Sequence, residues 1–282
     1  MNLDHNTLDM AIMLTATIIP MTTDSQYSNI EARRNEYLQA VRFYSQFGTV
    51  FFLENSTYDL LHDSEFLNIP NVFYRKMPID NNPEHAKGWQ EFHMIDQWVE
   101  TESNMPKRWI KVSGRYIFDN FVDIYRQCEQ TERSIIMDLN ASKRYAATYL
   151  FYVTTDCYKE FFMEKYCLCR NFLPIEKIIY ILLRYIKFHD ISIFLQEPNY
   201  SVISGGNNKS IHRKSQLRLF FLNIIRKINL KIYPYALIFY IPGFSFLKRI
   251  INFILEIIYI HAVEKENLKS HSKKGKINKY WQ

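Results

Sequence analysis

The chain has 282 residues, of which 48% are hydrophobic and 16% aromatic, and this composition excludes a disordered protein. Its 7 glycines argue against a glycine-rich nucleotide-binding loop. The net charge of +6 is uneven, because residues 1–205 hold 26 Asp and Glu against 20 Lys and Arg, whereas residues 206–282 hold 3 against 15. We therefore expect an acidic globular domain over 1–205 and a basic C-terminal segment over 206–282.

Strands and helices are predicted to alternate along the acidic part. In chain order the patterns indicate strand 10–19, helix 30–47, strands 49–55 and 71–77, helix 88–101, strand 109–116, strands 134–139 and 147–154, and helices around 156–169 and 174–188. This alternation predicts an α/β fold with a mostly parallel sheet and helices on both faces. Ligands of such folds bind beyond the carboxyl ends of the strands.

The first predicted helix carries a cation on its apolar stripe. Ile30, Tyr37, Val41 and Tyr44 recur at helical spacing, and Arg34 falls among them. An inward arginine needs an anionic partner. Three interpretations stay open: a ligand phosphate at the end of the preceding strand, a salt bridge to an internal carboxylate, or an arginine that reaches solvent at the edge of the core.

The strand in "WIKVSGRYIFDN" ends in two cations separated by a glycine. Strand alternation places Lys111 on the side of Trp109, and Gly114 permits a bend that delivers Arg115 and Tyr116 to the carboxyl edge of the sheet. Lys111 and Arg115 together would suit a diphosphate. The alternative is an ordinary solvated arginine after a turn.

The basic C-terminal segment predicts a membrane surface as a partner. Its longest uncharged stretch, 232–247, is shorter than the roughly 20 apolar residues of a bilayer span and contains Pro234 and Pro242. Apolar residues interrupted by Lys and Arg favour helices at an anionic membrane surface, expected over 211–263. The alternative is a helical subdomain packed on the core. The high apolar content argues against nucleic acid as a partner.

Cysteine spacing and the N-terminus bear on localisation. The four cysteines lack the spacing of a zinc site and are expected to be thiols. The first 20 residues lack the basic region of a signal peptide. We expect a cytoplasmic protein at the inner face of the cell membrane.

Two neighbouring motifs resemble a known family. "HAKGWQEFHMIDQWV" and the following "RWIKVSGRYIFDN" are similar to the K-G-x-x-E helix and K-x-x-G-R-Y strand of GT-A-like glycosyltransferases from bacterial lipopolysaccharide, O-antigen and capsule clusters. The likeness extends over about 10–210 and is diffuse outside these motifs. It implies a GT-A-like fold and transfer of a sugar from a nucleotide-sugar donor to a glycan or glycolipid acceptor.

The resemblance also implies a donor site. Its residues would be Thr15, Thr17, Arg34, Lys87, Gly88, Lys111, Gly114, Arg115 and Tyr116. The chain departs from most GT-A enzymes because it contains no Asp-x-Asp motif for a divalent metal. We therefore expect no cofactor, although the sequence leaves a divalent metal open, and we expect Lys111 and Arg115 to hold the donor diphosphate in its place.

Inverting transfer needs a base for the acceptor hydroxyl. Glu176 is the first candidate, although a glutamate just after Pro174 is also an ordinary helix start. Glu91 is a second candidate, as base or as orienting group, and Asp138 a third. Two other functions stay open: a non-catalytic membrane-associated scaffold of a polysaccharide assembly complex, and another sugar-nucleotide-utilising transferase.

Overall fold

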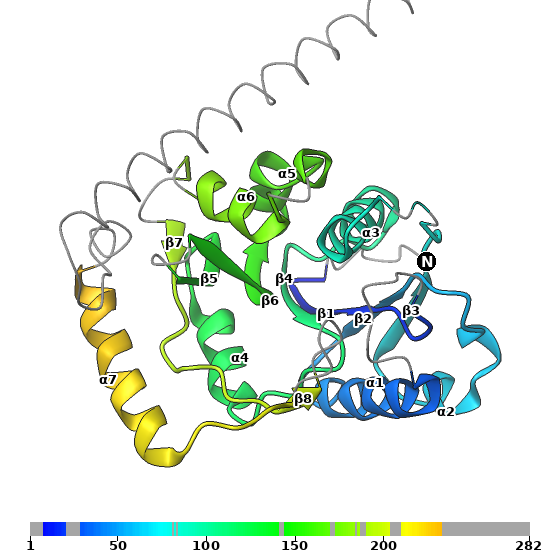
Figure 1. The fold of residues 1–282 in the computed structure, drawn as a ribbon, viewed down its shortest axis with the longest axis horizontal. Helices are drawn as coiled ribbons and strands as arrows, with labels where there is room; N and C mark the ends of the chain where they lie inside the picture. The colour runs from blue at the N-terminus through cyan, green and yellow to red at the C-terminus, as the bar shows by residue number, and fades with distance from the viewer. Residues whose placement is uncertain are drawn as a thin grey trace, which may run out of the picture.

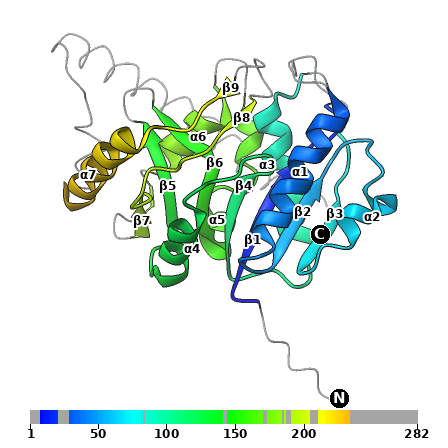
Figure 2. The same ribbon diagram turned by 90° about the horizontal axis from the view of Figure 1, so that it is seen from below.

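A computed structural model describes residues 8–20, 29–80, 82, 84–140, 144–169, 173–183, 185–186, 190–203 and 210–232. They form a seven-stranded sheet in the order β3-β2-β1-β4-β6-β5-β7 (Figures 1 and 2). The strands are β1 (Met10–Ala16), β2 (Val50–Glu54), β3 (Val72–Lys76), β4 (Arg108–Ser113), β5 (Ile135–Asn140), β6 (Tyr145–Thr154) and β7 (Ile191–Ser192). All neighbours pair in parallel except β6, which is antiparallel to β4 and β5. The predicted α/β class with a mostly parallel sheet is confirmed.

Helices cover both faces of this sheet. The longer ones are α1 (Ile30–Tyr44), α3 (Lys87–Thr101), α4 (Phe121–Gln130), α5 (Thr155–Phe161), α6 (Ile175–Leu182) and α7 (Gln216–Ile232). Short turns are η1 (Leu60–His62), α2 (Ser64–Leu67) and η2 (Lys165–Leu168), and β8 (Val202–Ile203) pairs with β9 (Ser210–Ile211). In Figure 1, α1 and α4 lie on one face, and α3, α5 and α6 on the other. The strand patterns did not reveal α4, and the predicted helix 156–169 is divided into α5 and η2.

The inner strand β1 is apolar from Met10 to Leu14 because both of its faces are covered. Ala11 and Met13 belong to the core beneath α3 and α6, whereas Ile12 and Leu14 belong to the core beneath α1 and α4. A strand buried on both faces shows a continuous apolar run rather than an alternating pattern. This property made "MAIMLTA" recognisable as a strand.

The predicted stripe residues Tyr37, Val41 and Tyr44 of α1 are buried, but the cation and the first residue of the stripe differ from the prediction. Ile30 is exposed, and the buried cation is Arg33, which precedes the buried Tyr37 by one helical turn. The side chain of Asn29 caps the helix by accepting from the amide of Ala32. Arg33 donates to the carbonyls of Thr17 and Ile18, so its partners are the backbone oxygens of the loop after β1.

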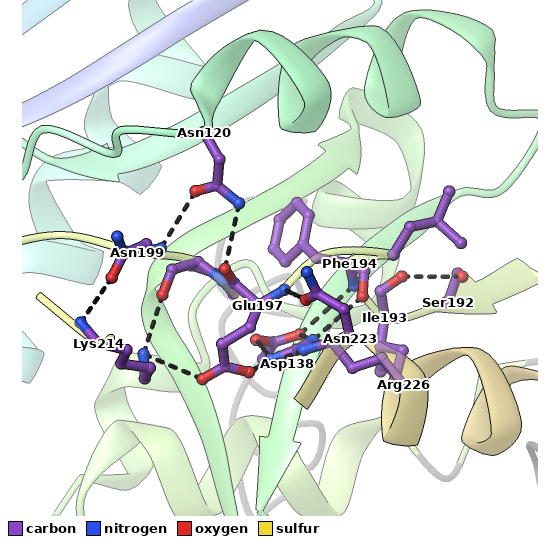
Figure 3. A network of polar contacts seen from close by, with 12 residues as sticks. Asn120, Asp138, Ser192, Ile193, Phe194, Glu197, Asn199, Lys214, Asn223 and Arg226 are labelled. Atoms are coloured by element: carbon purple, nitrogen blue, oxygen red, sulfur yellow. Dashed lines mark hydrogen bonds and ion pairs between the residues drawn. The ribbon is translucent and has the colours of Figure 1, made fainter. Parts of the chain in front are cut away.

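The start of the basic segment is attached to the acidic domain (Figure 3). Arg226 of α7 donates to both oxygens of Asp138, at 2.6 Å each, and also to Glu197. The amide of Glu197 donates to Asn223 Oδ1, and Lys214 Nζ lies 3.0 Å from Glu197 Oε1. The expected boundary at 205/206 falls between the paired strands β8 and β9, and beyond it Lys214, Asn223 and Arg226 contact the domain. The rest of the predicted membrane segment, 233–263, lies outside the described residues.

A buried carboxylate on α3 makes the stability of the fold depend on pH. Asp96 accepts from the hydroxyl of Tyr158 at 2.6 Å and from the amide of Glu164. Burial raises its pKa from 3.8 to about 7, against the opposing effect of these two hydrogen bonds. Because the pKa is raised in the folded protein, the folded state retains a proton that the unfolded state releases between these values.

We expect this contribution to the free energy of unfolding to be complete below pH 4 and to be lost as the pH rises to about 7, by at most about 1.4 kcal/mol per pH unit. Urea denaturation at pH 5 and pH 8 measures the loss, and Asp96→Asn should remove it. Asp156→Asn, at an exposed position on α5, is the matched control. Parallel stability profiles for wild type and Asp96→Asn would contradict this prediction.

Candidate active site

The carboxyl ends of four parallel strands meet at one edge of the sheet. The chain leaves β1 for β2 and β3 on one side, whereas β4 pairs with β1 on the other. The strand order therefore reverses between β1 and β4, and open α/β sheets bind ligands at the carboxyl side of such a switch point. Because β6 is antiparallel, its first residues lie at this same edge. The predicted site residues concentrate here.

Gly114 allows the ends of β4 and β1 to approach closely. Its amide donates to the carbonyl of Thr15 at 2.9 Å. A Cβ at this position would lie 2.6 Å from that oxygen and 3.0 Å from the ring of Tyr37. The glycine is therefore required by the close packing of the switch point.

Lys111 is fully buried behind this edge, and its ammonium group is surrounded by partners from the protein. Its Nζ lies 2.6 Å from Glu91 Oε1 and donates to Ser113 Oγ at 2.9 Å and to the carbonyl of Thr148 at 2.7 Å. These three contacts use all three donors of an ammonium group. Burial lowers the pKa of Lys111, and the carboxylates of Glu91 and Glu176 oppose that shift. In this arrangement Lys111 positions Glu91.

Glu91 links three elements of the site. Its Oε1 accepts from Thr15 Oγ1 of β1 at 2.6 Å and lies at the same distance from Lys111 Nζ of β4, while its own backbone belongs to α3. The side chain of Glu91 is 24% exposed. The predicted site residues Thr15, Glu91 and Lys111 therefore form one polar group, in which Glu91 is oriented and reaches the surface.

Glu176 approaches the same group from the first turn of α6. Burial raises the pKa of Glu176; its own backbone amide and the hydroxyl of Tyr145 oppose the shift by hydrogen bonding, Glu91 adds to it, and Lys111 lowers it. The two predicted catalytic glutamates are thus electrostatically coupled through a shared lysine. A carboxylate with a raised pKa suits a general base better than an ordinary one does.

Gly88 explains how the two helices converge. A Cβ on Gly88 would lie 2.6 Å from Ile175 Cγ2, so the first turns of α3 and α6 pack in direct contact. This contact brings Glu91 and Glu176 to one place. Lys87, the first residue of α3, is exposed beside it.

Arg115 and Tyr116 follow β4 at the rim of the site. Arg115 Nη1 donates to Glu36 Oε2 of α1 at 2.7 Å, and its side chain is 8% exposed. Burial lowers the pKa of Arg115, but Tyr37 and Glu36 outweigh that effect, so that the pKa is raised. Tyr116 stacks on Tyr149 with ring centroids 5.8 Å apart. Burial raises the pKa of Tyr116 to about 12.

Three predicted residues lie elsewhere or have other partners. Arg34 forms two 2.7 Å hydrogen bonds with Asp63, an internal salt bridge of the kind that the sequence left open. The carboxylate of Asp138 is held by Arg226 of α7 and so connects the basic segment to the domain. Thr17, which directly follows β1, donates from Oγ1 to Oδ1 of Asn55, which directly follows β2, at 2.6 Å.

The sequence interpretation missed the buried groups that shape this loop. Glu54 accepts from the amide of Ile18 at 3.2 Å and pairs with Lys76 at the end of β3. Together with Arg33, this pair holds the backbone after β1. A glutamate at the end of the apolar run "VFFLE" was the available signal, because a buried charge requires a partner.

In the described parts of the chain, no three His, Cys, Asp or Glu residues are grouped so that they could hold a metal ion. Over the same residues, no helix combines the length and apolar character needed to cross a bilayer.

Comparison with known proteins gives structural neighbours only. No family model and no curated protein matches this chain. Among the solved structures, GalNAc-T7 with UDP, GalNAc and Mn²⁺ is 9% identical over 64% of this chain and 40% of that chain, with a TM-score of 0.40. HddC from Yersinia pseudotuberculosis is 11% identical over 53% of this chain and 79% of that chain, with a TM-score of 0.31. The apo form of mouse xyloside xylosyltransferase 1 is 9% identical over 63% of this chain and 76% of that chain, with a TM-score of 0.30.

These neighbours include glycosyltransferases. This chain spans 40% of the length of the GalNAc-T7 structure. At these identities and TM-scores, the likeness does not bear on substrate or mechanism. What the chain itself defines is an α/β protein with a polar group at the switch point of a mostly parallel sheet.

Proposed function

We propose that this protein is a GT-A-like glycosyltransferase that moves a sugar from a nucleotide-sugar donor to a lipid-linked or surface-polysaccharide acceptor. One observation carries the proposal: the two motifs on which the family resemblance depends meet in space. Glu91 of the K-G-x-x-E motif contacts Lys111 of the K-x-x-G-R-Y motif at 2.6 Å, directly beside the end of β1. Residues 20 positions apart are thereby joined where such folds bind ligands.

The donor is proposed to lie across the carboxyl ends of β1 and β4. Thr15 and Gly114 form its floor, and Lys87, Gly88 and Tyr116 its rim. Arg115 is the proposed contact to the diphosphate, which would compete with Glu36 for the guanidinium. Lys111 acts indirectly, by holding Glu91 in place.

The proposed base is Glu176. In inverting transfer, the acceptor oxygen bonds to the anomeric carbon as the bond from that carbon to the diphosphate breaks. The acceptor proton passes to the Glu176 carboxylate, and the nucleoside diphosphate leaves with the bonding electrons. Glu91 orients the reacting sugar from the opposite side of Lys111. The raised pKa of Glu176 supports this assignment.

The cellular setting is part of the same proposal. We propose that the reaction takes place at the cytoplasmic side of the cell membrane, as the resemblance to bacterial surface-glycan enzymes implies, with the basic segment over 211–263 at an anionic surface. No cofactor is included, and a divalent metal is left to experiment. A lipid-linked acceptor would explain why an acidic domain carries such a segment.

Donor binding tests the proposal. Thermal shifts measured with UDP-, GDP-, CMP- and dTDP-sugars should identify one nucleotide that raises the melting temperature, because a ligand of the folded state stabilises it by mass action. Arg115→Ala should weaken that donor about 10- to 100-fold, the loss of one charge-assisted contact. Arg126→Ala, whose side chain is 61% exposed on α4, should bind as wild type does.

The remaining outcomes separate the alternatives. Donor binding without release of nucleoside diphosphate in the presence of membrane extracts would favour the scaffold. Strict Mg²⁺ dependence with release of pyrophosphate would indicate a nucleotidyl transferase. Equal donor affinity in Arg115→Ala and wild type would refute the proposed role of Arg115.

A further inference from the structure

Helix α7 presents an apolar stripe to solvent. Leu217, Phe220, Phe221 and Ile224 are 68%, 60%, 55% and 39% exposed. Their spacing of i, i+3, i+4 and i+7 places them on one side of a helix. At about 100° per residue, all four fall within an arc of roughly 100°. An apolar patch of this kind on a charged protein marks an interaction surface.

The opposite side of α7 is fixed to the domain. Asn223 and Arg226 contact Glu197 and Asp138, and the side chain of Arg226 is only 12% exposed (Figure 3). Four charge-assisted hydrogen bonds to two carboxylates hold a guanidinium in a defined orientation. The helix therefore cannot turn its apolar stripe inward without breaking these hydrogen bonds of Arg226.

Charge identifies the partner. The exposed Arg218 and Lys227 lie at the two borders of the apolar arc. Residues 210–232 contain six Lys and Arg and no Asp or Glu. A second copy of this helix would meet its own positive charge, and residues 233–282, with eight Lys and Arg against three Glu, are also basic. An anionic lipid surface matches both the apolar arc and its cationic borders.

We propose that α7 is an interfacial anchor, in which Leu217, Phe220, Phe221 and Ile224 enter the headgroup region of an anionic leaflet while Arg218 and Lys227 contact lipid phosphates. This inference deepens the proposed function, since it names the residues that would bring the enzyme to a lipid-linked acceptor. Because Arg226 fixes α7 to the domain, lipid binding would also fix the orientation of the domain on the membrane.

Co-sedimentation of the full chain with vesicles tests the anchor. Phosphatidylglycerol-containing vesicles should bind wild type, and Phe220→Ser/Phe221→Ser should bind at least about tenfold more weakly, because each phenyl ring loses its burial in lipid. Arg218→Gln/Lys227→Gln should lose about fivefold for each charge on these vesicles, and its preference for them over pure phosphatidylcholine should shrink by the same factor. Val122→Ser, 51% exposed on α4, is the matched control and should bind as wild type does.

Unchanged sedimentation of Phe220→Ser/Phe221→Ser would overturn the proposal. Analytical ultracentrifugation without vesicles gives a second test. A dimer of wild type that Phe220→Ser/Phe221→Ser does not form would also overturn the proposal, because the stripe would then bind a second copy of the chain. Thermal shifts with nucleotide-sugars are measured without lipid. If no nucleotide-sugar raises the melting temperature of wild type while wild type still binds vesicles, the proposed function is refuted and the anchor is not. If a nucleotide-sugar stabilises wild type but wild type does not bind vesicles, only the anchor is refuted.

Discussion

Lys111→Met is expected to lose sugar transfer and to unfold at a lower denaturant concentration. The substitution removes the buried cation beside Glu91 while it keeps most of the side-chain volume. Loss of one partner from a buried ion pair costs about 3–5 kcal/mol, and we expect the lower end because Glu91 reaches solvent. Urea denaturation measures the stability, and nucleoside diphosphate release with the identified donor measures the transfer.

A double variant separates the two effects. In Lys111→Met/Glu91→Gln the buried charge is absent, while a side-chain oxygen still accepts from Thr15, so that part of the lost stability should return, by about 0.5–3 kcal/mol. Transfer should stay absent because the carboxylate is gone. Lys107→Met, exposed just before β4, is the control. Full activity in Lys111→Met would show that transfer does not depend on the positioning of Glu91 by Lys111.

Glu176→Gln is expected to lower kcat about 10²- to 10⁴-fold, the usual contribution of a general base. Gln keeps the size of the side chain and its place in the first turn of α6, so the melting temperature and donor affinity should change little. The test is turnover at saturating donor. Glu160→Gln, exposed on α5 at the other end of β6, should turn over as wild type does.

The dependence of activity on pH should distinguish a catalytic base at Glu176 from a residue that only begins the helix. A base acts in its ionised form, and burial raises the pKa of Glu176 above its usual 4.5. Wild-type activity should therefore increase with pH through a range above that of an ordinary carboxylate, and Glu176→Gln should lack this acidic limb. If the limb persists in Glu176→Gln but disappears in Glu91→Gln, then Glu91 is the base.

Short-range patterns predicted six of the seven strands of the sheet, all except β7. The apolar run of β1 and the alternation in β4, where Trp109 and Lys111 lie on the side of α3 and Ile110 on the side of α1, follow from local periodicity. The buried cation of α1 was assigned one residue too late because Arg33 and Arg34 are adjacent. The pattern does not say which of the two finds buried acceptors.

Local patterns predicted the α/β class, the clustering of Lys111, Gly114 and Arg115 at a strand end, and the basic character of the C-terminal segment. The contact of Lys111 with Glu91 and that of Arg226 with Asp138 became visible only in the folded chain. The physical reason is that strand and helix periods depend on neighbours along the chain, whereas a buried charge is satisfied by whichever group the fold brings to it. Residues far apart in the sequence supply that group, and no local pattern records them.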